Sequence, residues 1–180
     1  PASANVLPVR LASPLAPRIS RMMVEVAVVL LTGGLWFAAD LTRALARHGR
    51  HLRFDALWLA SYGDGKESKG RIEVRAPLQR SVEGRKVLIL DDVFDTGRSV
   101  EAIIQELKNK ARLNTPLDIR VAVPYYKPSR NELNWEPHFY LHRTDAWLKY
   151  PHSLEGLSAE EIKANRPALY EILKPHLAAH

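Results

Sequence analysis

One strand-like apolar segment of the sequence ends in a group of carboxylates. Asp91 and Asp92 directly follow the apolar residues 87–90, and Asp95 comes three positions later. Two adjacent ionised carboxylates at a buried strand end repel each other and lose hydration unless a cation or hydrogen-bond donors meet them. A pair of ribose hydroxyls would do so, as would Mg²⁺ held through water. The acid pair therefore favours a binding site at this strand end.

The residues from Asp95 to Ser99 form a glycine-containing turn ahead of an apolar-periodic helix. N–H groups at a helix start have no partner within the helix, and together with the helix dipole they attract an anion. Thr96 and Ser99 add hydroxyl donors, which suits the three acceptor oxygens of a phosphomonoester. A simple helix cap is the favoured interpretation of such a turn when it stands alone. Next to Asp91 and Asp92, however, the turn offers phosphate donors beside hydroxyl acceptors, the groups that a ribose 5-phosphate requires.

Alternating strands and helices are expected to position these groups. Apolar runs and polar–apolar alternation predict strands at 26–31, 54–60, 71–76, 86–90, 118–124 and 138–141. Apolar residues at three- and four-residue spacing predict helices over 35–48 and 100–111, and a short helix is expected near 18–24. Ser158 and Glu161 form a capping-box pattern before a last helical segment, which Pro167 interrupts. The order predicts an α/β fold with a doubly wound, mainly parallel sheet flanked by helices.

Three loops, beginning at residues 32, 61 and 91, follow strand ends, where ligands bind in such sheets. The loop at 61–70 is polar and rich in glycine, so it is expected to be exposed and mobile. Residues 1–17 hold four prolines and are predicted to form an extended arm, with a single domain over 18–180. The loops at 32, 61 and 91 are therefore the candidate walls of one site.

The composition is that of an ordinary globular protein of 180 residues, with 46% hydrophobic and 26% charged residues. No apolar run is long enough to span a bilayer, and no signal peptide is recognisable, so a membrane partner is not expected. The absence of cysteine excludes a disulfide scaffold and a thiolate metal site, and it fits a cytoplasmic location. The formal charge of +6 favours an anionic partner, either a phosphorylated small molecule or nucleic acid.

The segment LILDDVFDTGRS at 88–99 resembles the phosphoribosyl pyrophosphate (PRPP) binding motif of type I phosphoribosyltransferases. About a dozen positions agree in order, which makes this motif specific. The resemblance implies that Asp91 and Asp92 hold the ribose 2- and 3-hydroxyls. It implies that the 5-phosphate is bound by Asp95, Thr96, Gly97, Arg98 and Ser99. It also implies that Asp95 lies near N7 of a purine base and handles its proton, as the catalytic residue, although a turn residue that accepts backbone N–H bonds is the alternative role.

The segment Leu31-Thr32-Gly33-Gly34 resembles the pyrophosphate-binding loop of purine phosphoribosyltransferases, although an ordinary strand-to-helix turn would also explain it. Its glycines allow close approach of the backbone to an anion. Many relatives have a basic residue at the position of Thr32, so backbone groups are the expected pyrophosphate ligands here. Relatives often have a cis peptide between the positions matching Leu31 and Thr32.

Two further segments resemble parts of the hypoxanthine-guanine and xanthine-guanine enzymes. Ser61-Tyr62 resembles the Ser-Tyr start of a lid that closes over the site and excludes water. Lys127 matches a lysine that contacts the exocyclic oxygen of a 6-oxopurine. Trp147 and Leu148 match a pair that stacks on the base, although a core position for Trp147 is an equally ordinary interpretation. The predicted hood over the base is formed mainly by residues 125–157.

The resemblance implies an Mg²⁺-dependent transfer of the phosphoribosyl group of PRPP to a 6-oxopurine, either hypoxanthine, guanine or xanthine. The products would be pyrophosphate and a nucleoside monophosphate, as in purine salvage. Mg²⁺, the implied cofactor, is expected to bind mainly through the substrate, with Asp91 and Asp92 as candidate ligands. A homodimer or homotetramer is expected.

Two alternative functions remain open. The first is a regulator with the same fold that binds PRPP or a nucleotide together with nucleic acid, without significant catalysis. The basic charge permits this, but such a protein should present a basic face away from the site, and nucleic acid is not expected as a partner. The second is a receiver-type signalling domain with paired acids after a strand. That alternative does not explain the Thr-Gly-Arg-Ser turn.

Overall fold

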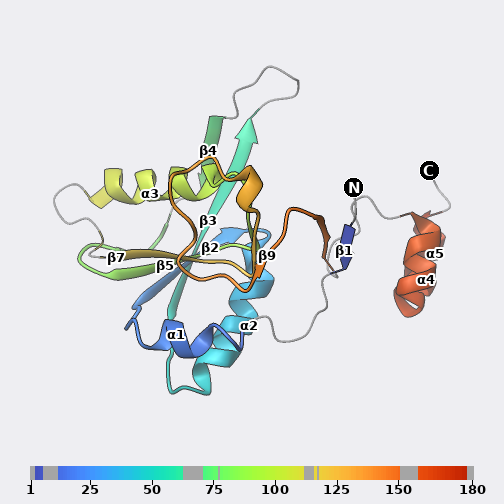
Figure 1. Ribbon diagram of the computed structural model, residues 1–180, viewed down its shortest axis with the longest axis horizontal. Coiled ribbons are helices and arrows are strands. Elements are labelled where there is room, and N and C mark those ends of the chain that lie inside the picture. The colour runs from blue at the N-terminus through green and yellow to red at the C-terminus, as the bar shows by residue number, and fades with distance from the viewer. Residues whose placement is uncertain are drawn as a thin grey trace. The chain divides into compact units, whose positions relative to one another are not determined.

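A computed structural model describes residues 3–5, 12–62, 71–76, 78–111, 116, 118–150 and 158–177 (Figure 1). The chain divides into two compact units. Residues Val9–Asp145 form the larger unit, and Pro1–Pro8 with Ala146–His180 form the smaller one. The predicted single domain over 18–180 includes residues of both units, and the predicted hood at 125–157 continues past the boundary at Asp145.

The larger unit is built on a five-stranded sheet with the order β4-β3-β2-β5-β7. Its strands are β2 (Val26–Leu31), β3 (Arg53–Tyr62), β4 (Arg71–Ala76), β5 (Lys86–Leu90) and β7 (Asp118–Ala122). All pairings are parallel except that of β4 with β3 at one edge. The chain winds outward from β2 to β3 on one side and continues with β5 and β7 on the other. The predicted doubly wound, mainly parallel sheet is thus confirmed, and its winding reverses between β2 and β5.

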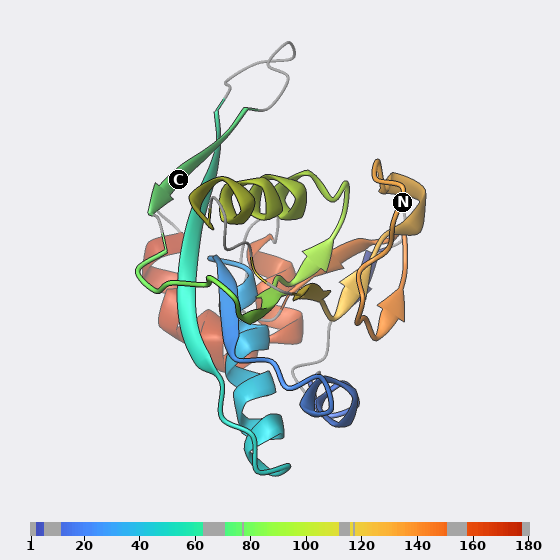
Figure 2. The ribbon, with the colours of Figure 1, turned by 90° about the vertical axis from the view of Figure 1, so that its left-hand side faces the viewer.

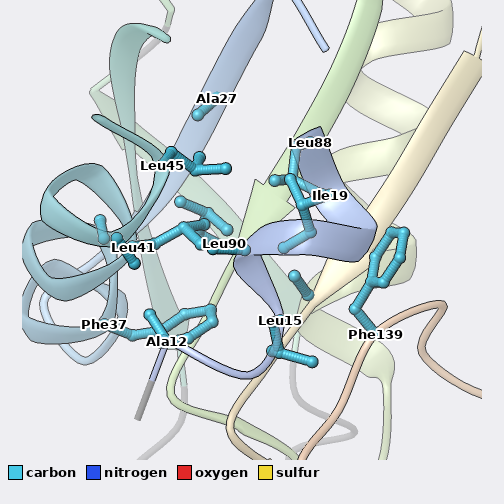
Figure 3. Packing of buried hydrophobic residues seen from close by; sticks show 14 of the residues in the cluster. Ala12, Leu15, Ile19, Ala27, Phe37, Leu41, Leu45, Leu88, Leu90 and Phe139 are labelled. Carbon is cyan, nitrogen blue, oxygen red and sulfur yellow. The ribbon is translucent and has the colours of Figure 1, made fainter. Parts of the chain in front are cut away.

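Alternating side chains give the central strands two apolar faces. One face packs against α1 (Ala16–Ser20) and α2 (Gly34–Ala46), and the other packs against α3 (Arg98–Ala111). Figures 1 and 2 show α3 on one side of the sheet and α1 and α2 on the other. The residues facing α1 and α2 include Ala27, Leu88 and Leu90 (Figure 3). Val29 belongs to the same cluster. Cover on both faces explains the continuous apolar runs of β2 and β5.

The segment before β2 belongs to the core. Ala12, Leu15 and Ile19 are almost completely buried, and they pack in one cluster with Phe139 (Figure 3). The predicted extended arm over 1–17 is therefore wrong for residues 12–17, and the short helix begins before the predicted residue 18. Prolines misled this prediction, because Pro17 lies in the first turn of α1, where a backbone N–H is not needed.

The predicted strand at 138–141 is reduced to one bridge between Ala122 and Phe139. The Nδ1 atom of His138 accepts the N–H of Val121 at 3.2 Å, in place of the backbone oxygen of a paired strand. The chain instead forms a small parallel sheet of β6 (Val93–Phe94), β8 (Tyr125–Tyr126) and β9 (His142–Arg143). A single 3₁₀ turn, η1 (Pro128–Arg130), follows β8.

In the smaller unit, β1 (Ser3–Asn5) pairs in parallel with β10 (Trp147–Lys149). Helix α4 (Ala159–Asn165) begins with the predicted capping box of Ser158 and Glu161, and α5 (Pro167–Leu177) begins at the predicted break. Across the described ranges of both units, no helix has the length and apolar character needed to cross a membrane.

Candidate active site

The loops that follow β2 and β5 meet beyond the carboxyl ends of these strands. A Cβ atom built on Gly33 would lie 2.7 Å from both Cγ and Oδ1 of Asp92. A Cβ on Gly34 would lie 2.6 Å from the carbonyl oxygen of Leu90. Gly33 has ordinary right-handed backbone angles, so close approach rather than conformation requires glycine here. The structure thus brings the predicted pyrophosphate loop against the predicted sugar-binding acids, and the Leu31–Thr32 peptide bond is cis, as the resemblance implies.

The acid pair is electrostatically strained within the chain itself. Asp91 is half-buried, and its Oδ1 accepts the N–H of Asp92 at 2.9 Å. Burial raises the pKa of Asp91 well above its ordinary value, and the neighbouring charge of Asp92 raises this pKa further. A cation or a pair of hydroxyl donors at this position would relieve both effects.

The turn after these acids begins helix α3. Gly97 has a φ of +83°, and a Cβ built there would lie 2.7 Å from Leu133, so both conformation and space require glycine. The N–H of Glu101 donates to the carbonyl of Gly97 at 2.9 Å, which starts the helix. Arg98 is paired with Glu132 through an Nε–Oε2 contact of 2.6 Å. Because Glu132 already compensates this guanidinium, backbone amides are better suited than the Arg98 side chain to bind an anion at the turn.

Lys127 and Asp95 form a second polar pair beside the turn. The side chain of Lys127 is 6% exposed, and its Nζ lies 3.6 Å from Oδ2 of Asp95. The backbone N–H of Lys127 donates to the carbonyl of Phe94 at 2.9 Å, which fixes the lysine next to β6. A hydrogen-bond donor that cannot accept therefore lies beside an acceptor. The two residues that sequence analysis predicts on the base side are thus neighbours.

Arg130 belongs to this group as well, although sequence analysis did not find it. Its Nε lies 2.5 Å from Oδ1 of Asp95. The signal in the sequence is the three-residue spacing between Lys127 and Arg130, because residues i and i+3 of a 3₁₀ turn lie on the same side. Asp145 supports the turn by accepting the N–H of Ser129 at 3.1 Å, and hydrogen bonding to Ser129 is the main cause that lowers the pKa of Asp145.

A model of the phosphoribosyl transferase domain matches residues 19–144 of this sequence. The chain belongs to the phosphoribosyltransferase family. Hypoxanthine-guanine phosphoribosyltransferase from Staphylococcus epidermidis is 32% identical over 111 residues, which cover 62% of this chain and 58% of the relative. The enzyme of the same name from Aquifex aeolicus is 31% identical over 114 residues, or 63% of this chain and 60% of the relative. The chain thus aligns with about three fifths of the length of these relatives.

Solved phosphoribosyltransferase structures share the fold. Purine phosphoribosyltransferase from Pyrococcus horikoshii superimposes with a TM-score of 0.68 at 21% identity, covering 84% of this chain and 94% of that one. A hypoxanthine phosphoribosyltransferase from Staphylococcus aureus gives 0.64 at 22% identity, covering 76% and 73%. At these identities the likeness shows the fold alone, and it agrees with the predicted type I phosphoribosyltransferase sheet.

The predicted start of the lid differs from expectation, and the predicted base-stacking pair lies in the smaller unit. Ser61 and Tyr62 are the last residues of β3, where they pair with β4, so the predicted loop at 61–70 is wrong for these two residues. Residues 63–70 lie outside the described ranges. Trp147 and Leu148 lie on β10 of the smaller unit, and Trp147 is 63% exposed. The core interpretation of Trp147 is thus not supported, and the lid and stacking roles stay predictions.

The donor groups of this family member fit Mg²⁺ held mainly by its substrate. Among the described residues, no group of three or more His, Asp or Glu side chains could hold a metal ion. The paired carboxylates of Asp91 and Asp92 supply hard oxygen donors of the kind that Mg²⁺ takes singly or in pairs. Burial and the neighbouring charge of Asp92 raise the pKa of Asp91, so positive charge at this position would be favourable. The chain therefore supplies a carboxylate edge, to which substrate oxygens and water would add the remaining ligands.

Proposed function

We propose that this protein transfers the phosphoribosyl group of PRPP to a 6-oxopurine, releasing pyrophosphate and forming a nucleoside monophosphate. The observation that carries the proposal is the contact of Gly33 with the carboxylate of Asp92. It brings the loop at 31–34 against the acid pair where the sheet winding reverses, and the turn at 95–99 follows these acids directly in the chain. PRPP carries pyrophosphate, sugar hydroxyls and a 5-phosphate, and these three segments offer matching partners for them.

The chain contributes positioning and electrostatics to this reaction. Asp91 and Asp92 accept hydrogen bonds from the ribose hydroxyls, while amides of residues 96–99 hold the 5-phosphate. Backbone groups of residues 31–34 bind the pyrophosphate. Holding both ends of PRPP orients C1 of the ribose toward the base, which converts a bimolecular encounter into a positioned reaction. Mg²⁺, when bound, neutralises charge on the leaving pyrophosphate.

The pair of Lys127 and Asp95 supports a 6-oxopurine as the acceptor. The ammonium of Lys127 donates to the oxygen at position 6, and Asp95 accepts the N–H at position 7 and takes its proton. A 6-aminopurine would turn an amino group toward Lys127, so two donors would face each other without an acceptor. The matches of Trp147 and Leu148 to a base-stacking pair, and of Ser61 and Tyr62 to the start of a lid, stay predictions from the sequence. The names of the curated relatives support the same substrate class.

A pyrophosphate-release assay with PRPP and Mg²⁺ tests the proposal against guanine, hypoxanthine, xanthine, adenine and uracil. We expect turnover with at least one 6-oxopurine and at least about 100-fold less with adenine, because an unpaired buried donor is costly. Asp95→Asn should lower turnover more than PRPP affinity, whereas Asp92→Asn should weaken PRPP binding. Absence of turnover with every base would contradict the proposal, and salt-sensitive binding of RNA in its place would favour the regulator.

A further inference from the structure

Arg130 touches Asp95 without belonging to the segments that bind sugar, phosphate or pyrophosphate. The two carboxylate oxygens of Asp95 face different cations. Oδ1 lies 2.5 Å from Nε of Arg130, and Oδ2 lies 3.6 Å from Nζ of Lys127. Oδ1 is buried and accepts no hydrogen bond within the described ranges, so the Arg130 guanidinium is the charge that compensates this oxygen. Loss of Arg130 would leave one side of the carboxylate without a counter-charge.

The backbone fixes both cations relative to Asp95. Lys127 is tied to Phe94 through its N–H, and η1 then turns the chain within three residues. Within the turn, the N–H of Arg130 donates to the carbonyl of Lys127 at 3.3 Å. Asp145 holds the turn from the other side through the N–H of Ser129. A short hydrogen-bonded segment therefore fixes which cation lies beside each carboxylate oxygen of Asp95.

We propose that Arg130 is a positioning residue that selects which oxygen of Asp95 meets the purine. It engages Oδ1, so that Oδ2 stays beside the Lys127 ammonium as the acceptor for the N–H at position 7. The donor and the acceptor then face the base together. Without Arg130 the carboxylate can rotate, and Lys127 is drawn to whichever oxygen is free instead of to the base. This inference rests on the proposed transfer to a 6-oxopurine.

Arg130→Gln tests the inference in the whole 180-residue chain. We expect kcat with the preferred 6-oxopurine to fall by about 10- to 100-fold, the scale associated with misplacing a reacting group by about 1 Å. The KM for PRPP should change by less than about twofold, because Arg130 lies outside the PRPP segments. Arg130→Lys should recover part of the loss, since an ammonium can still pair with Oδ1. This split between kcat and KM is not expected from a general loss of stability.

Arg143→Gln is the matched control. The side chains of Arg143 and Arg130 are equally exposed, at 54%, and Arg143 is paired with Glu136 at 3.6 Å instead of with Asp95. The control removes the same charge from a neighbouring segment and should leave kcat within about twofold of the parent, as expected for an exposed ion pair. Thermal unfolding of both variants shows whether they remain folded to the same extent.

A double-mutant cycle separates an effect through Asp95 from any other effect of Arg130. If Arg130 acts by positioning Asp95, then Arg130→Gln should change kcat by less than about threefold in an Asp95→Asn background. An equal loss in both backgrounds would overturn the inference, as would an Arg130→Gln variant as active as Arg143→Gln. A parent chain that turns over no base would overturn the proposed function, and the inference would fall with it.

Discussion

The two ends of the β2–β5 strand pair carry acids in opposite electrostatic situations. At the amino end, Glu25 faces Arg85 at 3.0 Å and accepts the N–H of Lys86 at 3.1 Å. The hydrogen bond from this backbone N–H is the main cause that lowers the pKa of Glu25. At the carboxyl end, burial and the charge of Asp92 raise the pKa of Asp91. Neighbouring groups of the fold thus stabilise the ionised form of Glu25. The ionised form of Asp91 is instead disfavoured, and a bound ligand can remove this penalty, which is typical of functional sites.

Two glycines of the larger unit differ in the same way. Gly49, near the amino ends of the strands, has a φ of +66° and would meet no atom within 4 Å if it carried a Cβ. Gly33, at the carboxyl ends, has ordinary angles but no room for a Cβ against Asp92. Gly49 is thus required by its backbone turn, and Gly33 by the close approach of two loops of the site.

The largest effect is expected from Gly33→Ala. The added methyl group would push Asp92 and the loop at 31–34 apart, at a cost of about 1–3 kcal/mol in unfolding free energy. We expect pyrophosphate release to fall by about 100-fold, since displacement of positioning groups has effects of this size. Gly49→Ala should cost about 1 kcal/mol through its left-handed backbone and leave turnover unchanged. Equal turnover of the two variants would show that the approach of Gly33 to Asp92 does not serve the site.

Asp91→Asn is expected to stabilise the unliganded protein while it impairs function. Asparagine keeps an oxygen that can accept the N–H of Asp92 and removes a half-buried charge beside the like charge of Asp92. We expect the Tm at neutral pH to rise by about 2–4 °C, which corresponds to about 1 kcal/mol in a chain of this length. Turnover should fall by about 10- to 100-fold as a charged hydrogen bond to the ribose is lost. A lower Tm would mean that the carboxylate of Asp91 stabilises the fold.

The pH dependence of stability should carry the signature of Asp91. Between its ordinary pKa of 3.8 and its raised value in the fold, the native state holds a proton that the unfolded state has released. The unfolding free energy therefore decreases as pH rises through this window. The Asp91→Asn variant lacks this pH-dependent contribution. Its advantage over the parent in unfolding free energy should therefore grow as pH rises through the window and then remain constant. Urea denaturation at a series of pH values measures the difference, and an advantage that shrinks with rising pH would contradict the raised pKa.

The smallest effect is expected from Glu25→Gln. Because the pKa of Glu25 is lowered in the fold, its ionised form contributes stability above its ordinary value of 4.5. This contribution is lost as pH falls through the lowered value. The variant should have a slightly lower Tm than the parent at neutral pH, and this difference in Tm should disappear under acid conditions. Its turnover should equal that of the parent. A turnover loss like that of Asp91→Asn would remove the distinction between the two strand ends.

The sheet and the acidic loop could be predicted because their signals are local. Continuous apolar runs mark strands covered on both faces, and LILDDVFDTGRS places its acids and its turn in one segment. The end of β3 was predicted too early because pairing with β4 carries the strand through Ser61 and Tyr62. The burial of Ala12, Leu15 and Ile19 depends on contacts with distant segments such as Phe139, which no local pattern reveals.

The base side was harder to predict for a similar reason. Lys127 could be matched through a motif, but the role of Arg130 depends on its contact with Asp95, which is 35 positions earlier in the chain. The bridge at Phe139 likewise depends on a side-chain nitrogen of His138 taking the place of a strand oxygen. These features arise from how separate elements meet, and only the three-dimensional structure displays them.

Calorimetric titration of the protein with PRPP in the presence of Mg²⁺ tests the contrast between the two strand ends most directly. We expect the parent and Glu25→Gln to bind PRPP with the same Kd, and Asp91→Asn to bind at least about tenfold more weakly. Equal binding by all three proteins, or no binding by the parent, would contradict the assignment of the carboxyl end of the β2–β5 pair as the PRPP site.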